Sequence, residues 1–313
     1  MGVEAGDGRP PRGPTQGVAI RGMTKKSTLP KRPDGQLVAE RNEIAVLKLV
    51  RDFGHLRRAE IARGVWPKSK SRVAEKMAQV TVQRLLAKGM LQEKPNSIGG
   101  RALVLAARGA MHLRMYNIEA QDGYDLSSVA GPHYWHRTLG TRYLIERAAS
   151  GDQVFGEYAL QKNFGPVGRG ELIDRFEKLP DGIVLTPGAR RGYDQSIIAA
   201  DWIEVESSYK AENELGKIFA IAWNVGSWLN TAETLLLDRV IFVYDSRHRH
   251  ENMVLQSLQR YMAKHPAANP DLLSSIVLVR CEVGIPLVWK SYAEFDSAHL
   301  LKANASSLSG TNE

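Results

Sequence analysis

The chain has little cysteine and no long apolar run. Its 313 residues include one cysteine, Cys281, which excludes an internal disulfide and any zinc site that needs several thiolates. No uninterrupted apolar run approaches the ~18 residues of a membrane-spanning helix. The first twenty residues contain Asp, Glu, Gly and Pro where a signal peptide needs an apolar stretch. We therefore expect a protein of a reducing cytoplasm with no membrane contact.

The composition is that of a folded protein with an excess of positive charge. Hydrophobic residues make up 43% of the chain and charged residues 24%, which is typical of globular domains. Lys and Arg outnumber Asp and Glu by 42 to 34, giving a net charge of +8. An excess of this sign favours a polyanionic partner, although many basic proteins bind no nucleic acid.

Changes in pattern along the chain divide it into five segments. Residues 1–35 are rich in Gly, Pro, Lys and Arg without periodicity, so we expect a disordered basic arm. Residues 36–115 and 133–302 carry the periodic apolar patterns of two domains. The few periodic signals between them predict a linker over 116–132, and the small polar residues 303–313 predict a disordered tail.

The first domain reads as three helices followed by a hairpin. The helices are expected from Glu40 to Phe53, from Leu56 to Val65 and from Ser71 to Lys88, ended by Gly54, Pro67 and Gly89. Two short apolar runs, 90–93 and 102–105, flank the polar turn 95–101 and predict the two strands. This order is typical of a winged helix.

A polar stripe lies on the third helix. Ala78, Val82, Leu85 and Leu86 form its apolar side. Arg72, Lys76, Gln79 and Gln83, spaced i, i+4, i+7 and i+11, fall on the opposite side. Arg and Lys suit phosphate or guanine and Gln suits adenine, so we expect the stripe to enter a DNA major groove with Arg101 in the wing. A solvated helix face and a protein-binding winged helix are the alternatives.

The second domain predicts the order α-β-β-β-α-β-α-β. The helices are expected over His133 to Ala149, Tyr209 to Leu229 and Met253 to Ala263. The strands are expected over Val154 to Leu160, Gly182 to Leu185, Ile197 to Glu206, Arg239 to Tyr244 and Ser275 to Cys281.

Three carboxylates fall beside two of these strands. Glu204 and Glu206 point to one face of their strand because the side-chain period is two, and Asp181 begins the preceding strand. Convergence of the three would make an oxygen-lined pocket for Mg²⁺ or Mn²⁺. Lys210 follows as a cation that could neutralise charge on a scissile phosphate. An isolated E-x-E pair or Pro-Asp turn also occurs by chance.

Further residues are candidates by position alone. Glu157, in the first expected strand, and His133 or His136, in the preceding helix, would add a carboxylate or an imidazole to this site. Tyr209 lies next to it as a nucleophile or a packing residue. The basic loop 247–250 suits phosphate, or is simply solvated.

Pro180-Asp181, Glu204-x-Glu206 and Lys210, within an αβββαβ order, resemble the PD-(D/E)xK restriction-endonuclease-like superfamily, with the lysine displaced beyond the acidic strand. With the winged helix before it, the chain is similar to the replication-relaxation family over residues 40–282. The resemblance implies an α/β (α+β) protein in which Asp181 and Glu204 are metal ligands, Glu206 a third ligand or a base, and Lys210 the phosphate-facing cation.

The resemblance implies a bacterial, DNA-associated relaxase or accessory protein of plasmid mobilisation and conjugation. Its expected partners are double-stranded DNA at an origin or operator, relaxosome proteins and, in some cases, a second copy of the chain. Its expected activity is metal-dependent DNA nicking. The alternative is a non-catalytic transcription or replication regulator with a degenerate nuclease-like domain.

Overall fold

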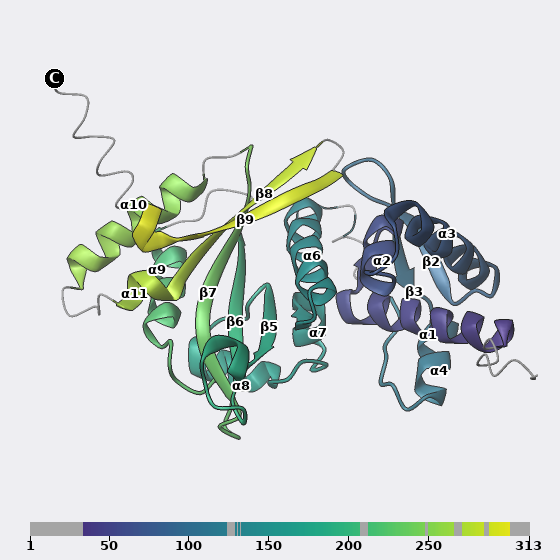
Figure 1. Ribbon diagram of the computed structural model, residues 1–313, viewed down its shortest axis with the longest axis horizontal. Helices are drawn as coiled ribbons and strands as arrows, with labels where there is room; N and C mark the ends of the chain where they lie inside the picture. Colours follow the sequence, from purple (N-terminus) through teal and green to yellow (C-terminus); the bar gives the residue numbers. More distant parts are fainter. Residues whose placement is uncertain are drawn as a thin grey trace, which may run out of the picture.

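The computed structural model describes residues 34–123, 129, 131, 133–206, 212–247, 250–265, 271–284 and 288–300 (Figure 1). The fold is mixed α/β, as predicted, with a three-stranded and a six-stranded sheet. The tail 303–313 and most of the expected basic arm lie outside the described residues. Gly35, the last residue assigned to the arm, already belongs to a helix.

The three helices and the hairpin expected in the first segment are present. They are α1 (Gly35–Phe53), α2 (Arg58–Val65), α3 (Ser71–Ala87), β2 (Leu91–Pro95) and β3 (Arg101–Leu105). Two elements were not expected: β1 (His55–Leu56), which pairs antiparallel with β3, and α4 (Ala107–Met115). Helix α1 begins earlier than expected because the Asp34 carboxylate accepts from the Gln36 N–H at 3.0 Å and caps it.

The second segment forms the six-stranded sheet, in the order β4-β5-β6-β7-β8-β9. Strands β6, β7 and β8 are parallel, and the other neighbours are antiparallel. Its strands are β4 (Gln153–Gly156), β5 (Gly182–Pro187), β6 (Ile198–Glu206), β7 (Leu235–Asp245), β8 (Ile276–Gly284) and β9 (Val288–Asp296). Its helices are α6 (Tyr134–Ala149), α7 (Glu157–Gln161), α8 (Arg169–Phe176), η1 (Gly188–Arg191), α9 (Glu212–Trp223), α10 (His250–Lys264) and α11 (Asp271–Ser275).

Two expectations for this segment were wrong in detail, and α8, η1, α11 and β9 were not expected. The strand expected over Val154 to Leu160 ends at Gly156, and Glu157 begins α7, because the buried run 158–160 packs as a helical turn. The chain turns after Trp223 instead of continuing to Leu229, and Gly226 takes a positive φ of 89° there. Strand β9 was missed because it is an edge strand with an exposed surface, so it has little apolar alternation.

The faces of the six-stranded sheet are covered by different helices (Figure 1). Helix α6 covers one face, where Leu139 and Tyr143 pack with Ile203 and Val205 of β6. Helices α9, α10 and α11 cover the other face, where Phe219 packs with alternate strand residues such as Trp202. The residues of β6 therefore belong alternately to two separate cores.

Helix α6 also packs against the first segment. One buried apolar cluster contains Val50 and Phe53 of α1 together with Leu139 and Tyr143 of α6. Arg63 of α2 donates to the Glu146 carboxylate of α6 at 2.8 and 2.9 Å. Figure 1 shows α6 standing between the sheet and helices α1 and α2. The helix is buried on two sides, and the segments on either side of it share a core.

A buried carboxylate organises the start of β6. Asp201, 1% exposed, contacts the guanidinium groups of Arg147, Arg191 and Arg239 at 3.5, 2.9 and 2.8 Å. Arg147 also binds Asp152 at 2.8 Å. Since a buried charge is tolerated only when it is paired, this network fixes α6, η1 and β7 relative to β6.

The close approach of α6 to β6 depends on Gly140. A Cβ at this position would lie 2.7 Å from Cγ2 of Val205, a short and fully buried side chain. We expect Gly140→Ala to lower the free energy of unfolding by about 1–3 kcal/mol, measured by urea denaturation. The control is Gly216→Ala in α9, where a Cβ has open space, and we expect it to be neutral or stabilising by about 1 kcal/mol. Equal effects of the two substitutions would contradict the packing argument.

Candidate functional site

The polar stripe of α3 faces outward. Arg72, Lys76, Gln79 and Gln83 are all exposed, while Ala78, Val82 and Leu85 on the opposite side are buried. Leu86, expected on the inner side, is half-buried. Two apolar residues, Val73 and Val80, are also exposed on α3 at 50% and 45%. The outward face of α3 thus offers two cations, two amides and two branched apolar side chains.

The hairpin beside α3 is partly held by the rest of the chain. In the loop between β2 and β3, the Ser97 N–H donates to the Val129 carbonyl at 3.3 Å and Ser97 Oγ donates to the Gly131 carbonyl at 3.1 Å. Arg101 is exposed, and its guanidinium lies 3.7 Å from the Glu93 carboxylate on the paired strand. Arg101 is therefore less available to a phosphate than the cations of α3.

Two of the three carboxylates predicted to converge, Glu204 and Asp181, have different partners. The side chains of Glu204 and Glu206 are both 0% exposed on the α9 face of β6. There Glu204 accepts from the Trp202 indole N–H at 2.8 Å and lies 3.2 Å from Lys178 Nζ. Asp181 accepts from the Val205 N–H at 2.8 Å and lies 3.2 Å from His136 Nε2 of α6. These contacts give Asp181 and Glu204 different partners.

Asp181 instead belongs to a small cavity on the α6 side of the sheet. His55, His136, Arg137, Glu157 and Asp181 line it, together with apolar neighbours. The Arg137 guanidinium contacts the Glu157 carboxylate at 3.1 Å. Burial raises the pKa of Glu157, an effect that Arg137 opposes and Asp181 reinforces. This cavity gathers two carboxylates, two imidazoles and a guanidinium from four separate stretches of chain.

Among the residues that the structure describes, no three or more His, Cys, Asp or Glu side chains are grouped so as to hold a metal ion. The donor set expected for Mg²⁺ or Mn²⁺ is Asp181, Glu204 and Glu206; of these, Asp181 contacts His136 and Glu204 contacts Lys178. Lys210 and Tyr209 lie outside the described residues, so the structure gives no position for the displaced lysine.

The remaining candidates have other partners. His133 is the exposed residue before α6 and is not among the residues that line the Asp181 cavity, whereas His136 is. Arg247, from the expected basic loop, is bound to the Asp245 carboxylate and lies over the Trp135 ring, 4.3 Å from its centroid. His248 and Arg249 lie outside the described residues.

Sequence reasoning missed Lys178, Arg137 and His55. Lys178 lies two residues before Pro180-Asp181, so its position in the sequence could have predicted that it lies near the carboxylates. Arg137 follows His136 on α6 and carried no separate signal. His55 comes from the first segment and reaches the cavity only because that segment packs on α6, which no local pattern indicates.

No protein-family model, curated protein or solved structure matches the chain. Within the described part of the chain, no helix has both the length and the apolar character needed to cross a membrane.

The buried histidine of the cavity gives a pH prediction. His55 is 2% exposed, and its ring lies 5.0 Å from that of Tyr134. Burial lowers the pKa of His55 to about 3, and the charges of Arg137 and Arg57 act in the same direction. Unfolded histidine has a pKa of about 6.5, so between about pH 6.5 and pH 3 only the unfolded state is protonated at this residue. The free energy of unfolding is therefore unaffected by the titration of His55 above pH 6.5 and decreases as the pH falls below that value.

We expect His55 to lower the free energy of unfolding by up to about 1.4 kcal/mol for each pH unit below 6.5. Urea denaturation of the wild type and His55→Phe at pH 7, 6 and 5 measures this contribution. The variant should show a shallower decline than the wild type, whereas His112→Gln, at a half-buried histidine in α4, serves as the control. Parallel declines in wild type and His55→Phe would show that His55 titrates normally in the folded protein.

Proposed function

We propose that the chain binds double-stranded DNA, with residues 36–115 acting as a winged helix and α3 entering the major groove. The observation that carries the proposal is the outward face of α3, on which Arg72, Lys76, Gln79 and Gln83 are all exposed. The order α1-β1-α2-α3-β2-β3, with a sheet completed by β1, agrees with this assignment. The function supported best is that of a DNA-binding regulator or replication accessory protein.

The chemistry of α3 suits both parts of duplex recognition. Arg72 and Lys76 offer cations for phosphate oxygens or guanine, and a net charge of +8 adds long-range attraction. Gln79 and Gln83 offer paired donors and acceptors for adenine. The exposed branched side chains of Val73 and Val80 match thymine methyl groups. Because the hairpin loop is held by Val129 and Gly131, we assign the main contacts to α3 and not to the wing.

Removal of the two cations should weaken duplex binding and reduce its salt dependence. We expect Arg72→Ala and Lys76→Ala each to lower the slope of log affinity against log salt by roughly one. Fluorescence anisotropy with a labelled duplex at several salt concentrations measures both quantities. Lys217→Ala in α9, a lysine whose side chain is 49% exposed, is the matched control and should leave the slope unchanged. An unchanged slope in both α3 variants would overturn the groove assignment.

Metal-dependent nicking by a PD-(D/E)xK-like domain of the replication-relaxation type is the second candidate. It is favoured by the position of Asp181, which binds the residues on both sides of Glu204. The Asp181 N–H donates to the Ile203 carbonyl at 3.0 Å, and the Asp181 carboxylate accepts from the Val205 N–H at 2.8 Å. Lys178, 3.2 Å from Glu204, offers a cation. Against it stands the complete burial of Glu204 and Glu206. We therefore rank binding without cleavage first.

A supercoiled plasmid separates the two candidates. With Mg²⁺ or Mn²⁺ present, we expect the purified protein to shift the plasmid in a gel without relaxing it. Relaxation that is lost in Asp181→Asn and Glu204→Gln, but kept in the exposed control Glu214→Gln, would instead establish the nuclease. Relaxation that survives in both site variants would point to a different catalytic site or a contaminant.

A further inference from the structure

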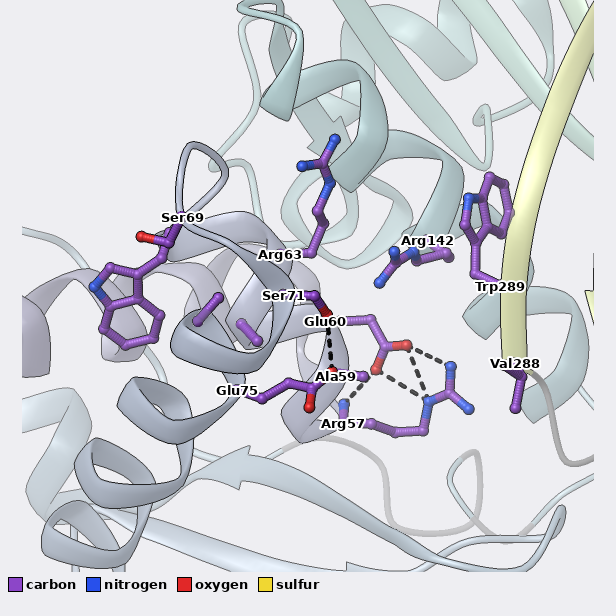
Figure 2. Close-up of a pocket in the computed structure, with 13 residues that line it drawn as sticks. Arg57, Ala59, Glu60, Arg63, Ser69, Ser71, Glu75, Arg142, Val288 and Trp289 are labelled. Atoms are coloured by element: carbon purple, nitrogen blue, oxygen red, sulfur yellow. Dashed lines mark hydrogen bonds and ion pairs between the residues drawn. The ribbon is translucent and has the colours of Figure 1, made fainter.

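A groove of about 480 Å³ lies where α2 and α3 meet α6 and β9 (Figure 2). Arg57 and Arg63 enter it from α2, Ser71 from the start of α3, Arg142 from α6 and Trp289 from β9. A volume of this order is typical of sites that hold a small organic group, and such sites often form between packed units. None of these residues belongs to the outward stripe of α3 or to the Asp181 cavity.

The groove combines cations with an aromatic surface. Figure 2 shows Arg142 beside Trp289, on the side of the groove opposite the first residues of α3. The guanidinium carbon of Arg142 lies 5.7 Å from the centroid of the Trp289 ring, and the indole is only half-buried. An indole face next to a guanidinium can stack a nucleobase while the cation contacts the attached phosphate.

The arginines keep donor capacity after pairing with protein carboxylates. Arg142 is 13% exposed and donates to Glu146 through Nη2 at 2.6 Å, but its buried Nε–H has no acceptor among the described residues. Arg63 shares the Glu146 carboxylate, so one carboxylate serves two guanidinium groups. A buried donor without an acceptor is unfavourable, so Arg142 is not fully satisfied by its protein partner.

The surroundings favour an anion. Lys68 and Lys70 are exposed in the loop that leads into α3. Helix α3 has no side-chain cap and no acidic residue in its first turn, and the Val73 and Ala74 N–H groups donate to the Lys70 carbonyl. The N–H groups of Ser71 and Arg72 are therefore the ones available to an acceptor at this end of the helix. Two carboxylates also line the groove, but Glu60 is bound by Arg57 and Glu75 accepts from Ser71 Oγ at 3.0 Å.

We propose that this groove binds single-stranded nucleic acid, with a base stacked on Trp289 and its phosphate at Arg142. A duplex does not fit this chemistry because neighbouring base pairs already cover the faces of its bases. A free nucleotide shares the chemistry of base and phosphate, but the cations around Lys68 and Lys70 continue beyond the groove, as a chain of phosphates requires. The inference goes beyond the proposed function, since it needs no contact from the outward face of α3.

The test uses the full chain and a fluorescein-labelled octathymidylate at low salt, followed by anisotropy. We expect Trp289→Ala to weaken binding roughly tenfold and Trp289→Phe to retain most of it, as removal of a stacking ring predicts. Trp223→Ala is the matched control: Trp223 is 40% exposed at the end of α9 and should leave binding unchanged. Thermal unfolding of each variant checks the fold, and Trp289→Phe decides the matter if Trp289→Ala does not fold.

Three results would overturn the inference. The first is unchanged affinity in Trp289→Ala or, if that variant does not fold, the same quenching of intrinsic tryptophan fluorescence by unlabelled octathymidylate in Trp289→Phe as in the wild type. The second is an equal loss of affinity in Trp223→Ala, and the third is dTMP binding as tightly as the octathymidylate, which would make the groove a nucleotide site. A duplex titration runs in parallel. Duplex affinity that depends on Arg72 and Lys76 but not on Trp289 keeps the two surfaces distinct, so failure of one proposal is distinguishable from failure of the other.

Discussion

The two-sided burial of helix α6 is the constraint on which the rest of the structure depends. On one side, Gly140 brings the helix against Val205 of β6. On the other, Glu146 binds Arg63 of α2, and residues of α1 and α6 belong to one apolar cluster. A helix packed in this way cannot shift toward one neighbour without opening a cavity against the other. The small cavity at Asp181 and the groove at Trp289 both contain α6 residues, so their shapes follow from its position.

The strand pattern explains why an acidic motif can be present without forming a pocket. Side chains alternate along β6, so Glu204 and Glu206 share a face, as the sequence predicts. That face is covered, and Glu204 is held there by Trp202 and Lys178. Asp181 precedes its strand and turns to His136. Spacing along a strand fixes which residues are on one side of a sheet, but not which way a residue before the strand points.

The predictable parts of the fold were those with strong local periodicity. Helices α2 and α3 and strands β6 and β7 carry regular apolar patterns, and their positions followed from the residues. The helical turn at Glu157 and the exposed strand β9 did not, because the turn is set by packing and an edge strand buries little surface. On α3, exposure of Arg72, Lys76, Gln79 and Gln83 was predictable from an amphipathic pattern alone. The cavity around His55 and the Trp289 groove were not, since each joins residues far apart in the chain.

The network around Asp201 limits how this chain can vary. One carboxylate at the start of β6 balances guanidinium groups from α6, η1 and β7 in a place that solvent does not reach. Neutral replacement of that single residue would remove the acid that all three guanidinium groups share, and would leave them only Asp152, Asp238 and Glu294 as acidic partners. A related chain without an acid at this position would therefore need to have changed its arginines as well. Substitutions at position 201 should therefore occur together with substitutions of its three arginines in related chains.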